Sequence, residues 1–142
     1  MGHRGGPAEV IWSSCGEAFD FLGERWGFAG PERTGQGVAF HRLGLHVLIE
    51  LVAWKHEAEF VTTLSLTDPD GRERRASLAC LYLACGLGAA QDVPASAGTS
   101  RHTIVRRIGQ HAAALGHVMP YLEGPGAAEL FRRCERRERP RG

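Results

Sequence analysis

The spacing of hydrophobic and polar positions changes twice along the 142-residue chain. In the segment SSCGEAFDFLGERWGF, Phe19, Leu22 and Trp26 recur at the spacing of one helix face. Between residues 37 and 67, apolar and polar residues alternate, as in strands that bury one face. After residue 75, helical spacing returns. The pattern therefore predicts one helix, then a sheet, then further helices.

The first helix is expected to begin at Ser14. Ser14 with Glu17 three residues later has the form of a capping box, in which each side chain satisfies a free backbone donor. Gly27 is a natural stop for this helix. Residues 1–12 are expected to form an irregular leader, and AGPERTGQG after the helix is expected to be a loop.

The alternating region predicts three antiparallel strands joined in a meander. A tight turn at Leu43-Gly44 pairs Phe40 with Val47, and a second turn at KHEA pairs Ile49 with Leu64. The other expected pairs are Val38–Ile49, Ala53–Phe60, Leu51–Thr62 and Val47–Leu66. This register places nearly every strongly apolar residue on one face, and a slip of one residue would destroy that arrangement. The segment DPDGRE is expected to close the meander as a turn.

Three helices are predicted after the sheet. Ser77 is the expected N-cap of a short helix that stops at Gly86, and a long helix from Ser100 is expected to end before Pro120. The segment AAELFRRCERRER predicts a last helix, and residues 136–142 are expected to fray into a basic tail. The predicted fold is a single α+β domain over residues 1–142. It consists of a three-stranded antiparallel meander with an N-terminal helix and three C-terminal helices packed on one face.

Composition narrows the possible functions. The formal net charge is +1, which gives no electrostatic reason to expect nucleic acid or a membrane surface as a partner. No apolar run reaches the ~18 residues of a membrane helix, and the start lacks the form of a signal peptide. A cytoplasmic location is therefore expected, and the four cysteines are expected to be free and buried rather than paired as disulfides.

Cys80 and Cys85 are the most conspicuous candidates for chemistry. Structural zinc favours closely spaced pairs, whereas the C-x4-C spacing turns the second cysteine away from the first on a helix. Both residues are therefore interpreted as core packing. The following GLG lacks the preceding strand of a dinucleotide-binding loop. No motif of a hydrolase, metalloprotease or P-loop is present, so no catalytic residue, metal or cofactor is predicted.

The strand register places His41 directly opposite His46. Such a pair can hold a metal, but the same register supplies no acidic or cysteine third ligand, so a solvated pair is favoured. The arginines of RRCERRERPRG can touch phosphate. Pairing with Glu135 and Glu138 along an exposed helix is the favoured interpretation of that segment.

The second face of the predicted sheet is too apolar for a purely solvated surface. An apolar centre with a polar rim is typical of a protein-binding patch. The predicted partner-binding residues are Trp54, Val52, Val61, Glu50, Glu59, His46 and His41. Cover by the first helix or by a homodimer mate is an equally open interpretation of this face.

Several stretches together resemble a group of small actinobacterial α+β proteins described as immunity-protein-like or uncharacterised. These stretches are FLGERWGF, VAFHR, LHVLIELV, ASLACLYLACGLG and HVMPYLEG. The resemblance covers residues 17–135 and concerns architecture, without a catalytic signature. It implies a protein that neutralises a cognate toxin by protein contact. The near-neutral charge departs from the acidic surface of nuclease-inhibiting immunity proteins, which argues against mimicry of nucleic acid.

Two functions of different classes follow from these observations. The leading hypothesis is a non-enzymatic interaction protein of immunity type, which binds a toxin or another partner through the second sheet face. The alternative is a small enzyme or ligand-binding accessory protein with a pocket between sheet and helices. His41, His46 and Glu50 would supply the polar groups of that pocket. Nucleic-acid binding by the arginine-rich tail is a third and weaker hypothesis.

Overall fold

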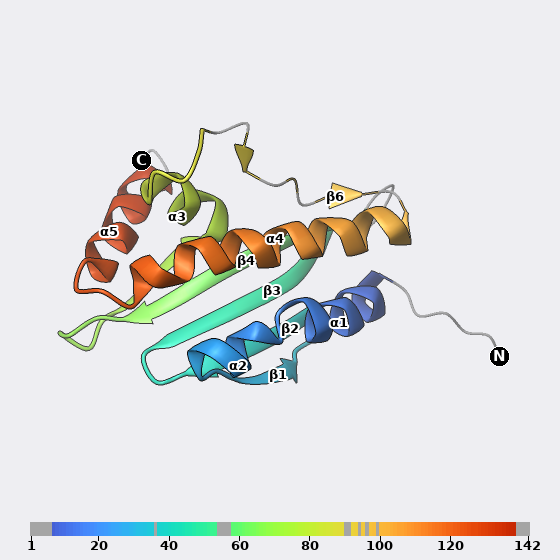
Figure 1. Ribbon diagram of the computed structural model, residues 1–142, viewed down its shortest axis with the longest axis horizontal. Helices are drawn as coiled ribbons and strands as arrows, with labels where there is room; N and C mark the ends of the chain where they lie inside the picture. The colour runs from blue at the N-terminus through green and yellow to red at the C-terminus, as the bar shows by residue number, and fades with distance from the viewer. Residues whose placement is uncertain are drawn as a thin grey trace.

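The computed structural model describes residues 7–35, 37–53, 58–89, 92–93, 95, 97–98 and 100–138. The fold is α+β, with an antiparallel sheet in the strand order β1-β2-β3-β4-β5 (Figure 1). Its strands are β1 (Ala29–Arg33), β2 (Gly37–Arg42), β3 (Leu45–Ala53), β4 (Ala58–Thr67) and β5 (Glu73–Ser77), and the short β6 (Ala97–Gly98) pairs with β4. The helices are α1 (Pro7–Ala18), α2 (Phe21–Trp26), α3 (Leu78–Ala84), α4 (Arg101–Leu122) and α5 (Ala127–Glu138).

The predicted α+β class is confirmed, but the three-stranded meander is wrong because one further strand lies on each side of it. All five residues of β1 are exposed, and the strand contains Pro31 and a register irregularity between Ala29 and Glu32. Strand β5 has the sequence ERRAS. Neither segment shows the apolar alternation by which a strand is detected, so both escaped prediction as strands.

The predicted register is confirmed on one side of β3 and shifted on the other. Strand β2 pairs with β3 as expected, with Phe40 opposite Val47. Between β3 and β4, Ile49 lies opposite Thr62 instead of Leu64, a shift of two residues. A shift of two keeps every side chain on its predicted face, so the hydrophobic pattern alone cannot detect it. The predicted turn KHEA falls largely on residues 54–57, which lie outside the described residues.

The N-terminal prediction needs correction. Helix α1 begins at Pro7, so the expected irregular leader does not extend through residue 12. Proline is favoured at the first helical position because its missing N–H would have no partner there. Ser14 lies inside α1, so it does not cap a helix. The single helix predicted up to Gly27 is wrong, because α1 ends at Ala18 and a separate helix, α2, begins at Phe21. Gly27 is the stop of α2, in a left-handed conformation with φ of 75°.

The C-terminal helices begin where the sequence predicts, but two of them end later than predicted. The Ser77 hydroxyl accepts a hydrogen bond from the Cys80 amide at 3.1 Å and caps α3, and Ser100 caps α4 through the Thr103 amide. Pro120 lies within α4, so the predicted end before it is wrong. Proline removes one helical hydrogen bond, and here only the last residues of the helix follow it. Helix α5 extends to Glu138, so the predicted frayed tail does not begin at residue 136.

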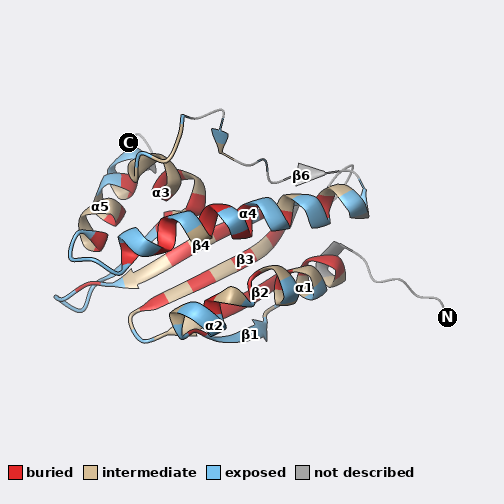
Figure 2. Cartoon of the chain, in the orientation of Figure 1, coloured by how far each residue is buried: buried red, intermediate tan, exposed pale blue. Residues whose placement is uncertain are grey.

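The helices cover one face of the sheet. Helix α1 contacts β2 and β3, α5 contacts β5, and α4 packs against α1 and α3 (Figure 1). In Figure 2, buried bands alternate with half-buried bands along β3. The fully buried core side chains include Phe19, Leu22, Phe40, Ile49, Phe60, Leu64, Leu81, Ile108, Leu115 and Phe131. Cys80 is part of this core and Cys85 is half-buried, in agreement with a packing role. None of the helices in the described part combines the length and apolarity that crossing a bilayer requires.

Candidate functional site

The face of the sheet turned away from the helices carries a mixture of polar and apolar side chains, most of them exposed or half-buried. We call this surface the open face. Its described side chains are Ala39, His41, His46, Leu48, Glu50, Glu59, Val61, Thr63, Ser65, Glu73 and Arg75. Val61 is 37% exposed, and Leu48 is half-buried. Within the described residues, no helix packs on this face.

A row of hydrogen-bonded side chains crosses the open face at one end. His41 and His46 are direct cross-strand partners, as predicted, and their Nδ1 atoms lie 2.9 Å apart. The other ring nitrogen of His41, Nε2, lies 2.8 Å from Oε1 of Glu32. Glu32 belongs to β1, in a segment whose sequence predicts a loop. The acidic neighbour that the predicted register did not supply is therefore present.

The chemistry of Glu32 assigns the hydrogen bonds in this row. A carboxylate only accepts, so Nε2 of His41 donates to it. In a neutral His41 ring, Nδ1 then carries the lone pair and accepts from Nδ1–H of His46. The Glu32 carboxylate thus fixes the tautomer of His41 and presents its Nδ1 lone pair to His46.

A hollow of ≈ 230 Å³ lies on the open face beside the histidines. Its other side is formed by Ser65, Glu73 and Arg75. The Ser65 hydroxyl donates to Oε2 of Glu73 at 2.7 Å, and Nε of Arg75 lies 3.8 Å from Oε1 of Glu73. Leu48 and Glu50 also line the hollow, so it offers charged groups of both signs beside an apolar side chain.

The structure places only some of the predicted partner-binding residues. His41, His46, Glu50, Val61 and Glu59 all lie on the open face. Trp54, the predicted aromatic centre, and the side chain of Val52 lie outside the described part of the chain. Glu32 was missed because its strand lacks alternation. The one available signal was an acidic residue, Glu32, within the expected loop AGPERTGQG.

The alternative pocket between sheet and helices cannot include the residues predicted for it. His41, His46 and Glu50 lie on the face opposite the helices, while the space between the layers is filled by the core.

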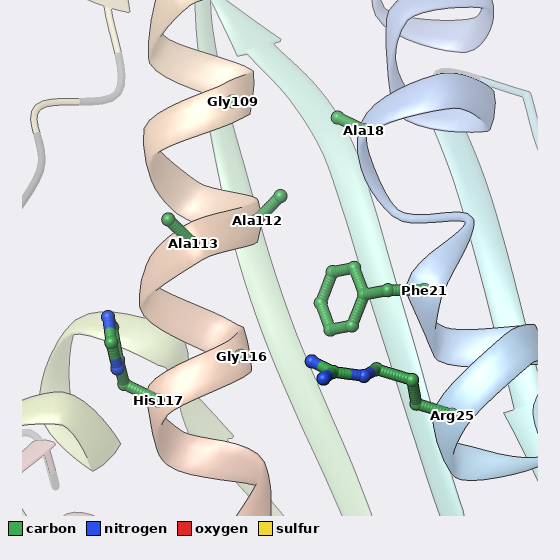
Figure 3. Close-up of a pocket in the computed structure, with 8 residues that line it drawn as sticks. All are labelled: Ala18, Phe21, Arg25, Gly109, Ala112, Ala113, Gly116 and His117. Atoms are coloured by element: carbon green, nitrogen blue, oxygen red, sulfur yellow. The ribbon is translucent and has the colours of Figure 1, made fainter.

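A larger groove of ≈ 480 Å³ lies instead between helices, with α1 and α2 on one side and α4 on the other. Figure 3 shows Phe21 and Arg25 pointing across it toward Gly116, whereas His117 lies on the other flank of α4. The floor of this groove is formed by glycine and alanine residues of α4, which offer no polar side chain to a ligand. Arg25 is the charged group of the groove.

Two chemical features limit what the described residues can do. No group of three or more histidine, cysteine or acidic residues in the described part is arranged to hold a metal, so a metal bound there would have at most two of these residues as ligands. Burial raises the pKa of the Cys15 thiol to about 12, which keeps it protonated and unsuited as a nucleophile.

Comparison with protein-family models, with curated proteins and with solved structures gives no match to this chain. The fold and the open face themselves therefore carry the functional argument.

Proposed function

We propose that the protein is a non-enzymatic interaction module of immunity type, which binds a cognate partner protein in the cytoplasm through the open face. The observation that carries this proposal is the mixed composition of a sheet face left uncovered by the described helices. In an antiparallel sheet with one solvated face, the outward positions are normally polar. Here Leu48 and Val61 lie among Glu50, Thr63 and the histidine pair.

The irregular edge strand β1 favours a partner site on the open face over one at this edge of the sheet. A partner strand that extends a sheet needs a row of free N–H and C=O groups. Pro31 removes one N–H from β1, and the register irregularity interrupts the row. The open face is therefore a better surface for a partner than the β1 edge, and its charged groups of both signs suit a partner of mixed charge.

The proposal predicts that a charge at Val61 abolishes partner capture. We expect Val61→Arg to reduce retention of the partner at least tenfold, because a guanidinium in the apolar centre must be desolvated on binding. Val105→Arg is the matched control, since Val105 lies on α4 and is 41% exposed against 37% for Val61. Each immobilised variant is incubated with an extract of the native host, and retained proteins are identified by mass spectrometry.

Support requires one polypeptide that the wild type and Val105→Arg retain and that Val61→Arg loses. The purified polypeptide must then bind the wild type directly. Circular dichroism and the thermal midpoint show that both variants fold. Equal retention by Val61→Arg and Val105→Arg would contradict the assignment of the open face.

A further inference from the structure

The histidine pair and Glu32 form an arrangement that partner binding does not require. We propose that His41 and His46 bind a divalent transition metal, with Zn²⁺ as the fitting ion, through their two Nδ1 atoms. Glu32 is the positioning residue of this site. The inference is independent of the proposed function, because it concerns the chain alone.

The first argument is the convergence of two imidazole nitrogens. The two Nδ1 atoms lie 2.9 Å apart on neighbouring strands. Two nitrogens bound to a tetrahedral zinc at about 2.0–2.1 Å lie about 3.3 Å from one another. The His41 side chain is 43% exposed, so a small rotation of the ring provides this separation without moving the backbone.

The second argument is the carboxylate behind His41. Histidines that bind a metal commonly donate their other ring N–H to a carboxylate, which fixes the tautomer and makes the free nitrogen a better ligand. Glu32 has this relation to His41, with Oε1 at 2.8 Å from Nε2. His46 becomes a ligand by transfer of its proton from Nδ1 to Nε2, so both rings bind the metal in their neutral form.

The third argument is the electrostatic setting of the site. The hollow beside the histidines is lined by Glu50 and Glu73, which favour a cation, and by Arg75, whose opposing charge is partly offset by Glu73 at 3.8 Å. Glu32 is bound to the far nitrogen of His41, and the described residues form no group of three metal ligands, so a four-coordinate zinc would have His41 and His46 as its protein ligands and water at its other two positions. The site is thus coordinatively open toward solvent.

Calorimetric titration of the full chain with ZnCl₂ tests the site, using protein free of any polyhistidine tag. The wild type is expected to bind one equivalent of Zn²⁺ saturably. His41→Ala and His46→Ala should each abolish this binding, and Glu32→Gln should weaken it by about tenfold because it removes only the supporting carboxylate. His102→Ala and His117→Ala are controls, because both histidines are exposed on α4 away from the sheet.

Co²⁺ provides a second measurement, since its visible absorption reports the ligands directly. The wild-type spectrum should change in His46→Ala and persist in His117→Ala. The proposal is overturned if the wild type shows no saturable Zn²⁺ binding, or if His46→Ala binds as the wild type does. Circular dichroism of each variant confirms that loss of binding is not loss of fold.

Discussion

Asp68 is a buried carboxylate that joins the turn after β4 to β5, and its partner Arg74 joins β5 to α5. The Asp68 side chain is 1% exposed and accepts hydrogen bonds from the amides of Asp70 and Arg72 and from Nε of Arg74. Arg74 in β5 also donates to Glu135 in α5 at 2.7 Å. Burial alone would raise the pKa of Asp68. The hydrogen bonds from Arg74, Arg72 and Asp70 outweigh burial and hold this pKa below its usual value.

The lowered pKa of Asp68 predicts a pH-dependent contribution to stability. A carboxyl with a depressed folded-state pKa stabilises the fold above its ordinary pKa, and this contribution is lost as pH falls through the folded value. Asp68→Asn should therefore lower the thermal midpoint at pH 7. The difference in thermal midpoint between this variant and the wild type should shrink as the pH falls below 3.8, the usual pKa of an aspartate. Thermal melts from pH 7 to strongly acidic pH measure this difference. The exposed Asp70→Asn is the control, and a constant difference at every pH would refute the role of the Asp68 charge.

The cysteines are predicted to differ in reactivity. Cys15, Cys80 and Cys134 are buried, whereas Cys85 is half-buried at the end of α3. Burial raises the pKa of Cys85 as well, but its partial exposure lets a reagent reach the sulfur. A disulfide reagent should modify one thiol of the native chain, and all four after unfolding. Cys85→Ser should remove the reaction of the native protein, and a native reaction that persists in this variant would contradict the assignment.

At the scale of elements, two glycines are expected to respond to alanine in opposite ways. A Cβ at Gly109 meets no atom within 4 Å, so Gly109→Ala should stabilise α4 by about 0.5–1 kcal/mol through helix propensity. A Cβ at Gly37 would overlap the Ile49 carbonyl oxygen, so Gly37→Ala should destabilise the sheet by roughly 1–3 kcal/mol. Urea denaturation measures both changes in the free energy of unfolding. A loss of stability in Gly109→Ala would show that the groove of Figure 3 does not tolerate the added methyl group.

The sequence predicts an element well where its signal is local. Ser77 and Ser100 cap their helices as expected, because an N-cap depends on residues three positions apart. Strand β1 could not be predicted in the same way. Its five exposed residues are ordered by pairing with β2, a contact that leaves no hydrophobic alternation in the sequence.

The same distinction applies to the candidate site. The opposition of His41 and His46 follows from a tight turn, so the sequence alone predicted it. Glu32 reaches His41 through the irregular pairing of β1 with β2, in which Glu32 lies opposite Ala39. Counting every second residue along β1 from Ala29, the partner of His41, does not lead to Glu32. The register shift between Ala29 and Glu32 changes which residues of β1 share the face of His41. The pair was predictable, and its carboxylate was not.

For the whole molecule, the layered arrangement separates the core from the face proposed for recognition. The helices and the inward sheet face form the core, while the open face contributes few fully buried side chains. Surface substitutions away from buried features usually change stability by less than about 0.5 kcal/mol. The exposed residues of the open face can therefore vary while the fold stays intact.

Strand β1 has a consequence for behaviour at high concentration. Exposed, flat strand edges are where chains join into fibrils. In β1, Pro31 and the bulge break the row of hydrogen-bonding groups, and Arg33 folds back to pair with Glu9 and to lie over the Trp12 ring. A second chain finds no continuous template at this edge. A sheet whose open face is free of the described helices is thus protected at β1 against amyloid-like growth.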